Sequence, residues 1–333
     1  MDTLLGFRGD NHTVWETDGK IHVQILGTLK IRTGDVVLEA GEVGGPKARQ
    51  ILEILLLQLG TPVSKSRLID MLWEGSAPLA AVSTLESYVS VLRRCLQPGQ
   101  GKNGVLRTTT GGYMLDPEIV DLDLSRFDSL ILRAEGSEPK IALPLLRQAL
   151  ALATEPLLGS ELLPGWADAE RSVHAARVAS AGILAAKLAL ELGMNLEAIR
   201  LSQEVLDRDT LNEAAWTCLV LGLEMGGNPL QGLQALDHCR RVMDRELGCS
   251  PGPVLQQAQE RLLRQTSAAD DDFGHVIGAL LSIQEVVAGH GNSAWQKAGT
   301  AGKDLGFSPQ EAGSVIFGFL QRALGAASVK SGV

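Results

Sequence analysis

The sequence predicts a mainly α-helical protein: an α+β domain comes first, a longer helical domain follows, and a small helical segment ends the chain. Two observations predict this class. Short β-prone runs flank three helical stripes within the first 117 residues. From residue 141 onward apolar residues recur at helical spacing, and one turn sequence occurs twice.

Two strands and two helices are expected at the beginning of the chain. Residues 21–27 and 36–39 read as strands. Pro46 follows two glycines, and a proline in the first turn starts a helix without losing a needed N–H group. Gly60-Thr61-Pro62 ends that helix, and Ser64 can then cap a second one.

A third helix is predicted over residues 83–96, and it is the most informative stretch. Its buried stripe comprises Leu85, Val89, Leu92 and Leu96. The opposite face carries groups that can meet base edges in the major groove of DNA, namely Thr84, Ser87, Tyr88, Val91 and Arg94. Two β-prone runs around Gly111-Gly112 predict a hairpin behind this helix. Strands, three helices and a terminal hairpin describe a winged helix-turn-helix domain.

The second half reads as a tetratricopeptide-like helical domain. A long helix is expected from Ala167 to Leu192. The turn sequence at residues 191–195 recurs at residues 224–228, a shift of 33 that is close to the tetratricopeptide period. Such arrays offer a concave surface for a protein partner. A helical domain that only dimerises is the alternative.

Charge is distributed unevenly along the chain, whose net charge is −9. Residues 21–117 hold ten Lys/Arg against eight Asp/Glu, whereas residues 118–265 hold fourteen against twenty-one. The basic excess of the first region is small, so phosphate contacts must be few and well placed, and dimerisation would raise the affinity.

No enzyme class finds support in the sequence. Gly299-Thr300-Ala301-Gly302-Lys303 resembles a phosphate-binding loop, but its spacing is wrong, and no Gly-x-Ser-x-Gly elbow occurs. The cysteines and histidines lack metal-ligand spacing, so neither a metal nor a cofactor is expected. The polar beginning and the lack of an apolar run of about 18 residues predict no signal peptide and no membrane span. We therefore expect a cytoplasmic, nucleoid-associated protein.

Ordered motifs carry a resemblance to a known family. Gly44-Gly45-Pro46-Lys47, residues 68–73, residues 84–94 and Gly111-Gly112-Tyr113-Met114-Leu115 resemble an OmpR/PhoB-type DNA-binding domain, in the version found in the SARP family (Streptomyces antibiotic regulatory proteins). The segment from Asp121 to Pro253, with its closing Glu-Leu-Gly-x-x-Pro-Gly-Pro, resembles the bacterial transcriptional activator domain of that family. The expected domains are an N-terminal extension (1–20), the winged helix (21–117), the activator domain (118–265), and a linker with an unrecognised helical segment (266–333).

The resemblance implies a sequence-specific transcriptional activator of a secondary-metabolite (antibiotic) gene cluster. It would bind direct repeats of double-stranded DNA near the promoter as a homodimer and recruit RNA polymerase through its sigma or alpha subunit. A tetratricopeptide-like adaptor that binds protein and no specific DNA is the alternative from another class.

Roles for individual residues follow from these two arguments. Base-facing positions are Thr84, Ser87, Tyr88 and Val91, while Arg93 and Arg94 should reach base edges or flanking phosphates. Phosphate contacts are expected from residues near helix N-termini, namely Lys47, Arg49, Lys65 and Arg67, with solvated surface as the alternative. The wing should probe DNA through Arg107, Thr108, Thr109 and Thr110, unless it is a plain hairpin. The family resemblance implies an activation loop over residues 74–79, with Glu74 and Pro78.

Overall fold

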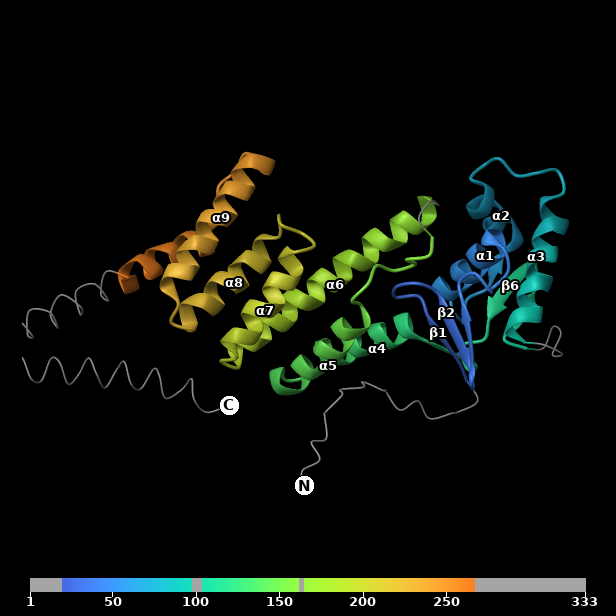
Figure 1. Ribbon diagram of the computed structural model, residues 1–333, viewed down its shortest axis with the longest axis horizontal. Helices are drawn as coiled ribbons and strands as arrows, with labels where there is room; N and C mark the ends of the chain where they lie inside the picture. The colour runs from blue at the N-terminus through green and yellow to red at the C-terminus, as the bar shows by residue number, and fades with distance from the viewer. Residues whose placement is uncertain (1–19, 98–103, 162–164, 267–333) are drawn as a thin grey trace, which may run out of the picture. The chain divides into compact units, whose positions relative to one another are not determined.

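A computed structural model describes residues 20–97, 104–161 and 165–266 (Figure 1). The predicted N-terminal extension and C-terminal segment lie outside the described residues, apart from their boundary residues 20 and 266. The chain divides into two compact units, one ending at Leu192 and the other beginning at Gly193. The sequence-based boundaries after residues 20, 117 and 265 stay predictions.

The first unit opens with a sheet of short strands. These are β1 (Ile21–Gln24), β2 (Lys30–Thr33), β3 (Val36–Glu39) and β7 (Val120–Leu122), in the order β3-β2-β1-β7. β1 pairs antiparallel with β2 and parallel with β7. The predicted strands at 21–27 and 36–39 are confirmed, the first of them shorter than expected, whereas β2 and β7 were not foreseen.

The helix-turn-helix and its wing follow. The helices are α1 (Pro46–Leu57), α2 (Lys65–Trp73) and α3 (Ala81–Leu96). Ser64 caps α2, since its hydroxyl accepts the Arg67 N–H at 3.2 Å. The wing consists of β5 (Leu106–Thr109) and β6 (Gly112–Leu115), and β6 also pairs with β4 (Val63–Ser64). The sequence therefore placed all three helices and the hairpin correctly; the turn lies at residues 110–111.

The winged helix and the next three helices share a hydrophobic core. Leu55 of α1 and Leu85 and Leu92 of α3 are fully buried at its centre. The same core reaches Phe127 of α4 (Asp123–Glu135) and Val178 of α6 (Gly165–Glu191). α5 (Pro139–Leu152) packs against both α4 and α6. The first unit is therefore more than a winged helix.

α6 qualifies the expectation that no segment could span a membrane. It is the one helix of the described residues that is long and apolar enough to cross a bilayer, judged by length and composition alone. Its apolar character comes largely from alanines, and Ala181, Ala185 and Ala189 are buried. Packing against α5 accounts for this composition, because small side chains let a long core helix approach its neighbour closely.

The second unit contains α7 (Asn195–Leu206), α8 (Glu213–Met225), α9 (Pro229–Leu247) and a final helix over residues 253–266. α8 packs against both α7 and α9. α7 begins at residue 195 and α9 at residue 229, so the helix pairs recur at the tetratricopeptide period of 34. The recurrence of the turn sequence had indicated a repeat length of 33 residues, which is one residue too short.

Candidate nucleic-acid interface

α3 presents a narrower polar face than the sequence indicated. Its buried residues include Leu85, Val89, Leu92 and Leu96, as predicted. The side directly opposite carries an exposed stripe at helical spacing: Ser83, Ser87, Ser90 and Arg94. Of the predicted face, Ser87 and Arg94 belong to this stripe, whereas Thr84, Tyr88 and Val91 lie half-buried at its flank.

The flank is covered by other parts of the winged helix. Tyr88 packs against the hydrophobic core. Val91 lies against the loop that precedes α1, where a Cβ added to Gly44 would come within 2.9 Å of its Cγ1 atom. Gly44 also has a φ of +78°, which favours glycine. Ser83 and Ser90 were missed as base-facing positions, although they lie about 180° from the buried stripe.

The serine hydroxyls of the stripe donate hydrogen bonds to backbone carbonyls three or four residues earlier in the chain. Ser83 donates to the Ala80 carbonyl at 3.0 Å, Ser87 to that of Ser83 at 3.0 Å, and Ser90 to that of Glu86 at 2.9 Å. A hydroxyl that donates in this way still has lone pairs free to accept. The outward side of α3 therefore offers acceptors from three serines and donors from the guanidinium of Arg94.

Arg93 connects α3 to the wing. Its guanidinium donates to the Leu106 carbonyl at 3.1 and 3.2 Å and to the Thr108 hydroxyl at 2.7 Å. It also lies 5.9 Å from the centre of the Tyr113 ring. These contacts fix the direction of the wing relative to α3 and occupy the Nε and Nη2 donors of the guanidinium that the sequence assigned to DNA.

The wing exposes only some of its predicted residues. Arg107 is 47% exposed and pairs with the buried carboxylate of Asp116. Thr110 lies exposed at the turn, whereas the Thr109 hydroxyl is buried and has no hydrogen-bond partner in the described structure. Gly112 follows the turn, where any side chain would overlap the backbone of Val63 in β4. Thr108 is also exposed, and its hydroxyl accepts from Arg93. Arg107, Thr108 and Thr110 are therefore the predicted wing residues that lie at the surface.

Two of the four predicted phosphate contacts lie at the surface, at the start of α2. Lys65 forms an ion pair with Glu86 of α3, with 2.6 Å between Nζ and Oε1. This hydrogen bond raises the pKa of Lys65. Arg67 is exposed, and no ion pair involves its side chain among residues 20–97, 104–161 and 165–266. α2 therefore brings two cations beside the wing and α3.

The other two predicted phosphate contacts are used inside the protein. Lys47 donates to the Leu72 carbonyl at the end of α2. Arg49 forms an ion pair with Glu161, and only 17% of its side chain is exposed. Gln50 donates to the same carboxylate at 2.9 Å. These contacts attach α1 to α2 and to the loop before α6.

The predicted activation loop combines a structural and an exposed part. Glu74 ends α2 with a φ of +46°, and its carboxylate accepts the Gly165 N–H at 3.1 Å, at the start of α6. Pro78 is exposed, and its carbonyl accepts the Ala81 N–H at the start of α3. Leu79 is fully exposed to solvent. This loop thus presents an apolar side chain between the two helices.

Among residues 20–97, 104–161 and 165–266, no group of three or more His, Cys, Asp or Glu side chains could hold a metal ion. All four cysteines are free; Cys218 and Cys239 are buried, and Cys249 is exposed.

A third helix with an exposed polar stripe, and a hairpin that an arginine fixes beside it, define a winged helix-turn-helix protein with appended helical repeats. Comparison with protein families agrees. The model described as "Transcriptional regulatory protein, C terminal" matches residues 43–115, and the bacterial transcriptional activator domain matches residues 122–263.

The relatives establish the family. The regulatory protein DnrI of Streptomyces peucetius is 31% identical over 67% of this chain and 86% of its own length. The regulator RedD of Streptomyces coelicolor is 26% identical over 76% of this chain and 73% of its own length. The chain belongs to the SARP family of transcriptional regulators. It spans only 25% of the regulatory protein AfsR of Streptomyces coelicolor, to which it is 29% identical.

The fold has a counterpart among solved structures. The structure of Mycobacterium tuberculosis EmbR in complex with a low-affinity phosphopeptide aligns with a TM-score of 0.65 and 24% identity. The alignment covers 78% of this chain and 70% of that one. At this identity the likeness concerns the fold alone.

Proposed function

We propose that this protein is a sequence-specific DNA-binding activator that binds direct repeats near promoters of a secondary-metabolite gene cluster. The exposed stripe of α3, bordered on one side by both the wing and the start of α2, is the observation that carries the proposal. The family membership and the names of the relatives as regulators support it.

Base recognition is assigned to the exposed stripe. Arg94 would donate to a guanine, whose N7 and O6 atoms accept a bidentate pair in the major groove. Ser87 and its neighbours Ser83 and Ser90 would accept from adenine or cytosine amino groups, because their own protons are already donated to the helix. Thr84, Tyr88 and Val91 would shape the flank of the interface.

Phosphate contacts are assigned to the accessible cations. Arg67 and Lys65 at the start of α2, and Arg107 on the wing, would border the duplex. Lys47, Arg49 and Arg93 would act as positioning residues, since each of them forms a hydrogen bond or ion pair within the first unit. A small number of phosphate contacts fits the low basic excess, and two copies on a direct repeat would compensate for it.

Activation is assigned to surfaces away from the base-facing stripe. The loop at residues 74–79 exposes Pro78 and Leu79, and the acidic helical domain offers a second surface for basic patches of RNA polymerase. Such a protein would act in the cytoplasm, on the nucleoid. In vitro transcription with purified polymerase and Leu79→Ala should show reduced transcript at unchanged promoter affinity.

The test compares two arginines on a promoter fragment at several salt concentrations. Arg94→Ala should cost about 1–3 kcal/mol of binding and change the base preference at one position of each repeat. Arg67→Ala should weaken binding equally across sequences and reduce the slope against salt by about one unit. If both variants weaken all sequences equally, the assignment of Arg94 to a base is refuted.

The helical repeats favour one other function. A tetratricopeptide-like array is a protein-binding surface, so the winged helix could serve an adaptor without specific DNA binding. The two functions differ in one measurement. If no promoter fragment binds at low salt, the adaptor function replaces the activator.

A further inference from the structure

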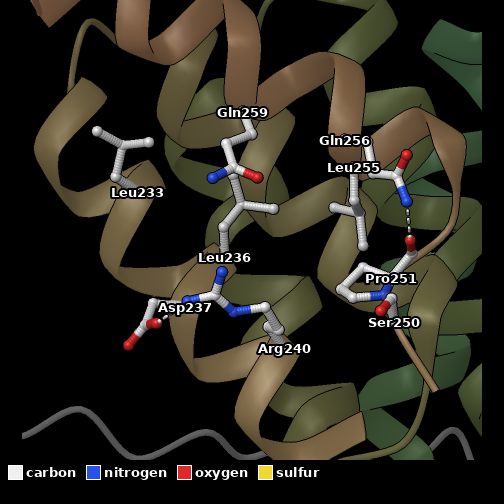
Figure 2. A pocket seen from close by; sticks show the side chains of 9 residues that line it. All are labelled: Leu233, Leu236, Asp237, Arg240, Ser250, Pro251, Leu255, Gln256 and Gln259. Atoms are coloured by element: carbon white, nitrogen blue, oxygen red, sulfur yellow. Dashed lines mark hydrogen bonds and ion pairs between the residues drawn. The ribbon is translucent and has the colours of Figure 1, made fainter. Parts of the chain in front are cut away.

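A groove lies between α9 and the final helix of the second unit (Figure 2). Its cavity volume is about 280 Å³. α9 contributes Leu233, Leu236, Asp237 and Arg240, and the following segment contributes Ser250, Pro251, Leu255, Gln256 and Gln259. We call this hollow the α9 groove.

Internal contacts already satisfy much of the polar lining. Arg240 forms an ion pair with Asp237 at 2.9 Å. Gln256 donates to the Pro251 carbonyl at 2.8 Å. Figure 2 shows Asp237 and Arg240 on α9 with Leu233 and Leu236, whereas Gln256 and Pro251 lie on the other side of the groove. The groove therefore offers leucine side chains beside polar groups that need no new partner.

Apolar side chains continue the groove towards the end of the final helix. Leu230 lies one turn before Leu233 on α9 and is 64% exposed. Leu263 lies one turn after Gln259 and is 49% exposed. The last helix of a tetratricopeptide-like array needs a polar outer face for solubility, and these two leucines do not provide one.

The final helix runs antiparallel to α9. A Cβ added to Gly232 would come within 2.9 Å of Leu262, near the start of α9 and the end of the final helix. Further along α9, Arg240 lines the same groove as Leu255, near the start of the final helix. The chain therefore continues beyond residue 266 from the apolar end of the groove.

The sequence supplies an occupant of suitable length and pattern. Residues 267–272 can span up to about 20 Å, enough to reverse direction. Residues 273–287 then carry apolar side chains at helical spacing: Phe273, Val276, Ile277, Leu280, Ile283 and Val287. As a helix this stretch would extend about 22 Å, close to the roughly 21 Å of the helix over residues 253–266.

We propose that residues 273–287 of this chain pack into the α9 groove as a further helix of the array. The segment turns back after residue 272 and covers Leu230, Leu233 and Leu263, just as each preceding helix covers the one before it. A partner protein that needs this groove would then have to displace the segment.

The full-length protein tests this with a photocrosslinking amino acid. Placed at position 259, which lines the groove, the probe should crosslink to residues 273–287 within the same chain. Gln257 is an exposed glutamine on another side of the same helix and is the matched control, where the yield should be several-fold lower. Peptide mass spectrometry on a mixture of light and isotopically heavy protein separates crosslinks within a chain from crosslinks between chains.

Hydrogen exchange gives an independent measurement on the same full chain. Ile277→Asp with Leu280→Asp should abolish the crosslink and accelerate amide exchange in residues 253–266. Ser282→Asp places the same charge on the opposite side of the predicted helix and should change neither. Equal crosslinking from positions 257 and 259, crosslinks only between chains, or unchanged exchange in the double variant would each overturn the proposal.

Discussion

Glu53 should destabilise the native protein at neutral pH, and replacing it should raise stability. Its side chain lies fully buried in α1, and neither carboxylate oxygen has a hydrogen-bond partner within the described residues. Burial raises the pKa of Glu53 to about 8, and the charge of Glu161 raises it further, while Arg49 and Arg171 act in the opposite direction. Folding at pH 7 therefore requires this carboxylate to take up a proton.

The cost follows from the two pKa values. In the unfolded chain the pKa of Glu53 is about 4.5, which lies about 2.5 units below pH 7. Keeping this side chain protonated in the native state at pH 7 therefore lowers the free energy of unfolding by about 3 kcal/mol. Because the folded pKa is the higher one, wild-type stability should fall as pH rises from 4.5 to 8 and be unaffected below 4.5. Glu53→Met removes the titrating group at similar volume, for a net gain of about 2 kcal/mol after repacking.

Urea unfolding followed by circular dichroism, between pH 4.5 and 8, measures both effects. The variant should unfold at higher urea and lose a slope of up to about 1.4 kcal/mol per pH unit that the wild type shows. Glu118→Gln makes the same charge change at an exposed position and should leave the slope intact. A variant with the wild-type slope would show that Glu53 is ionised in the folded protein.

The remaining predictions concern the wing and the turn. Gly112→Ala should lower stability by at least about 2 kcal/mol in urea unfolding, because its Cβ would overlap the Val63 backbone; Gly45→Ala, with open space around it, should not. Arg93→Ala should accelerate amide exchange in residues 106–115 and weaken binding to all DNA sequences alike, and a change of base preference would contradict this. Glu74→Ala should cost about 1 kcal/mol through the lost Gly165 N–H contact, and Glu74→Gln should recover most of it.

Local signals in the sequence determined the helices of the winged domain. Pro46 and the Ser64 cap mark helix starts because first-turn N–H groups have no partner within a helix. Leu85, Val89 and Leu92 mark the buried side of α3 because one face of a helix repeats every three to four residues. These patterns, with the ordered motifs, were sufficient to indicate the fold class and the family.

Tertiary packing decided the side of α3 that faces outward. The loop at Gly44 covers Val91, and the core covers Tyr88, so the accessible stripe moves to Ser83, Ser87 and Ser90. The spacing of apolar residues shows which side of a helix is buried. It does not show which neighbouring segments cover the borders of the opposite side. The same holds for β7, whose three residues form a strand only because β1 lies beside them.

For the basic residues too, the sequence and the tertiary structure determine different properties. The sequence predicted DNA contacts for Arg49, Arg67 and Arg93, but it did not show which of these side chains the fold leaves exposed. Arg49 meets Glu161 more than a hundred residues away, and Arg93 meets the wing, while Arg67 stays exposed. Whether residues distant in the sequence form an ion pair or a hydrogen bond depends on how the chain folds back on itself. The sequence therefore determined which residues carry charge, and the tertiary structure decided which of those charges a ligand can reach.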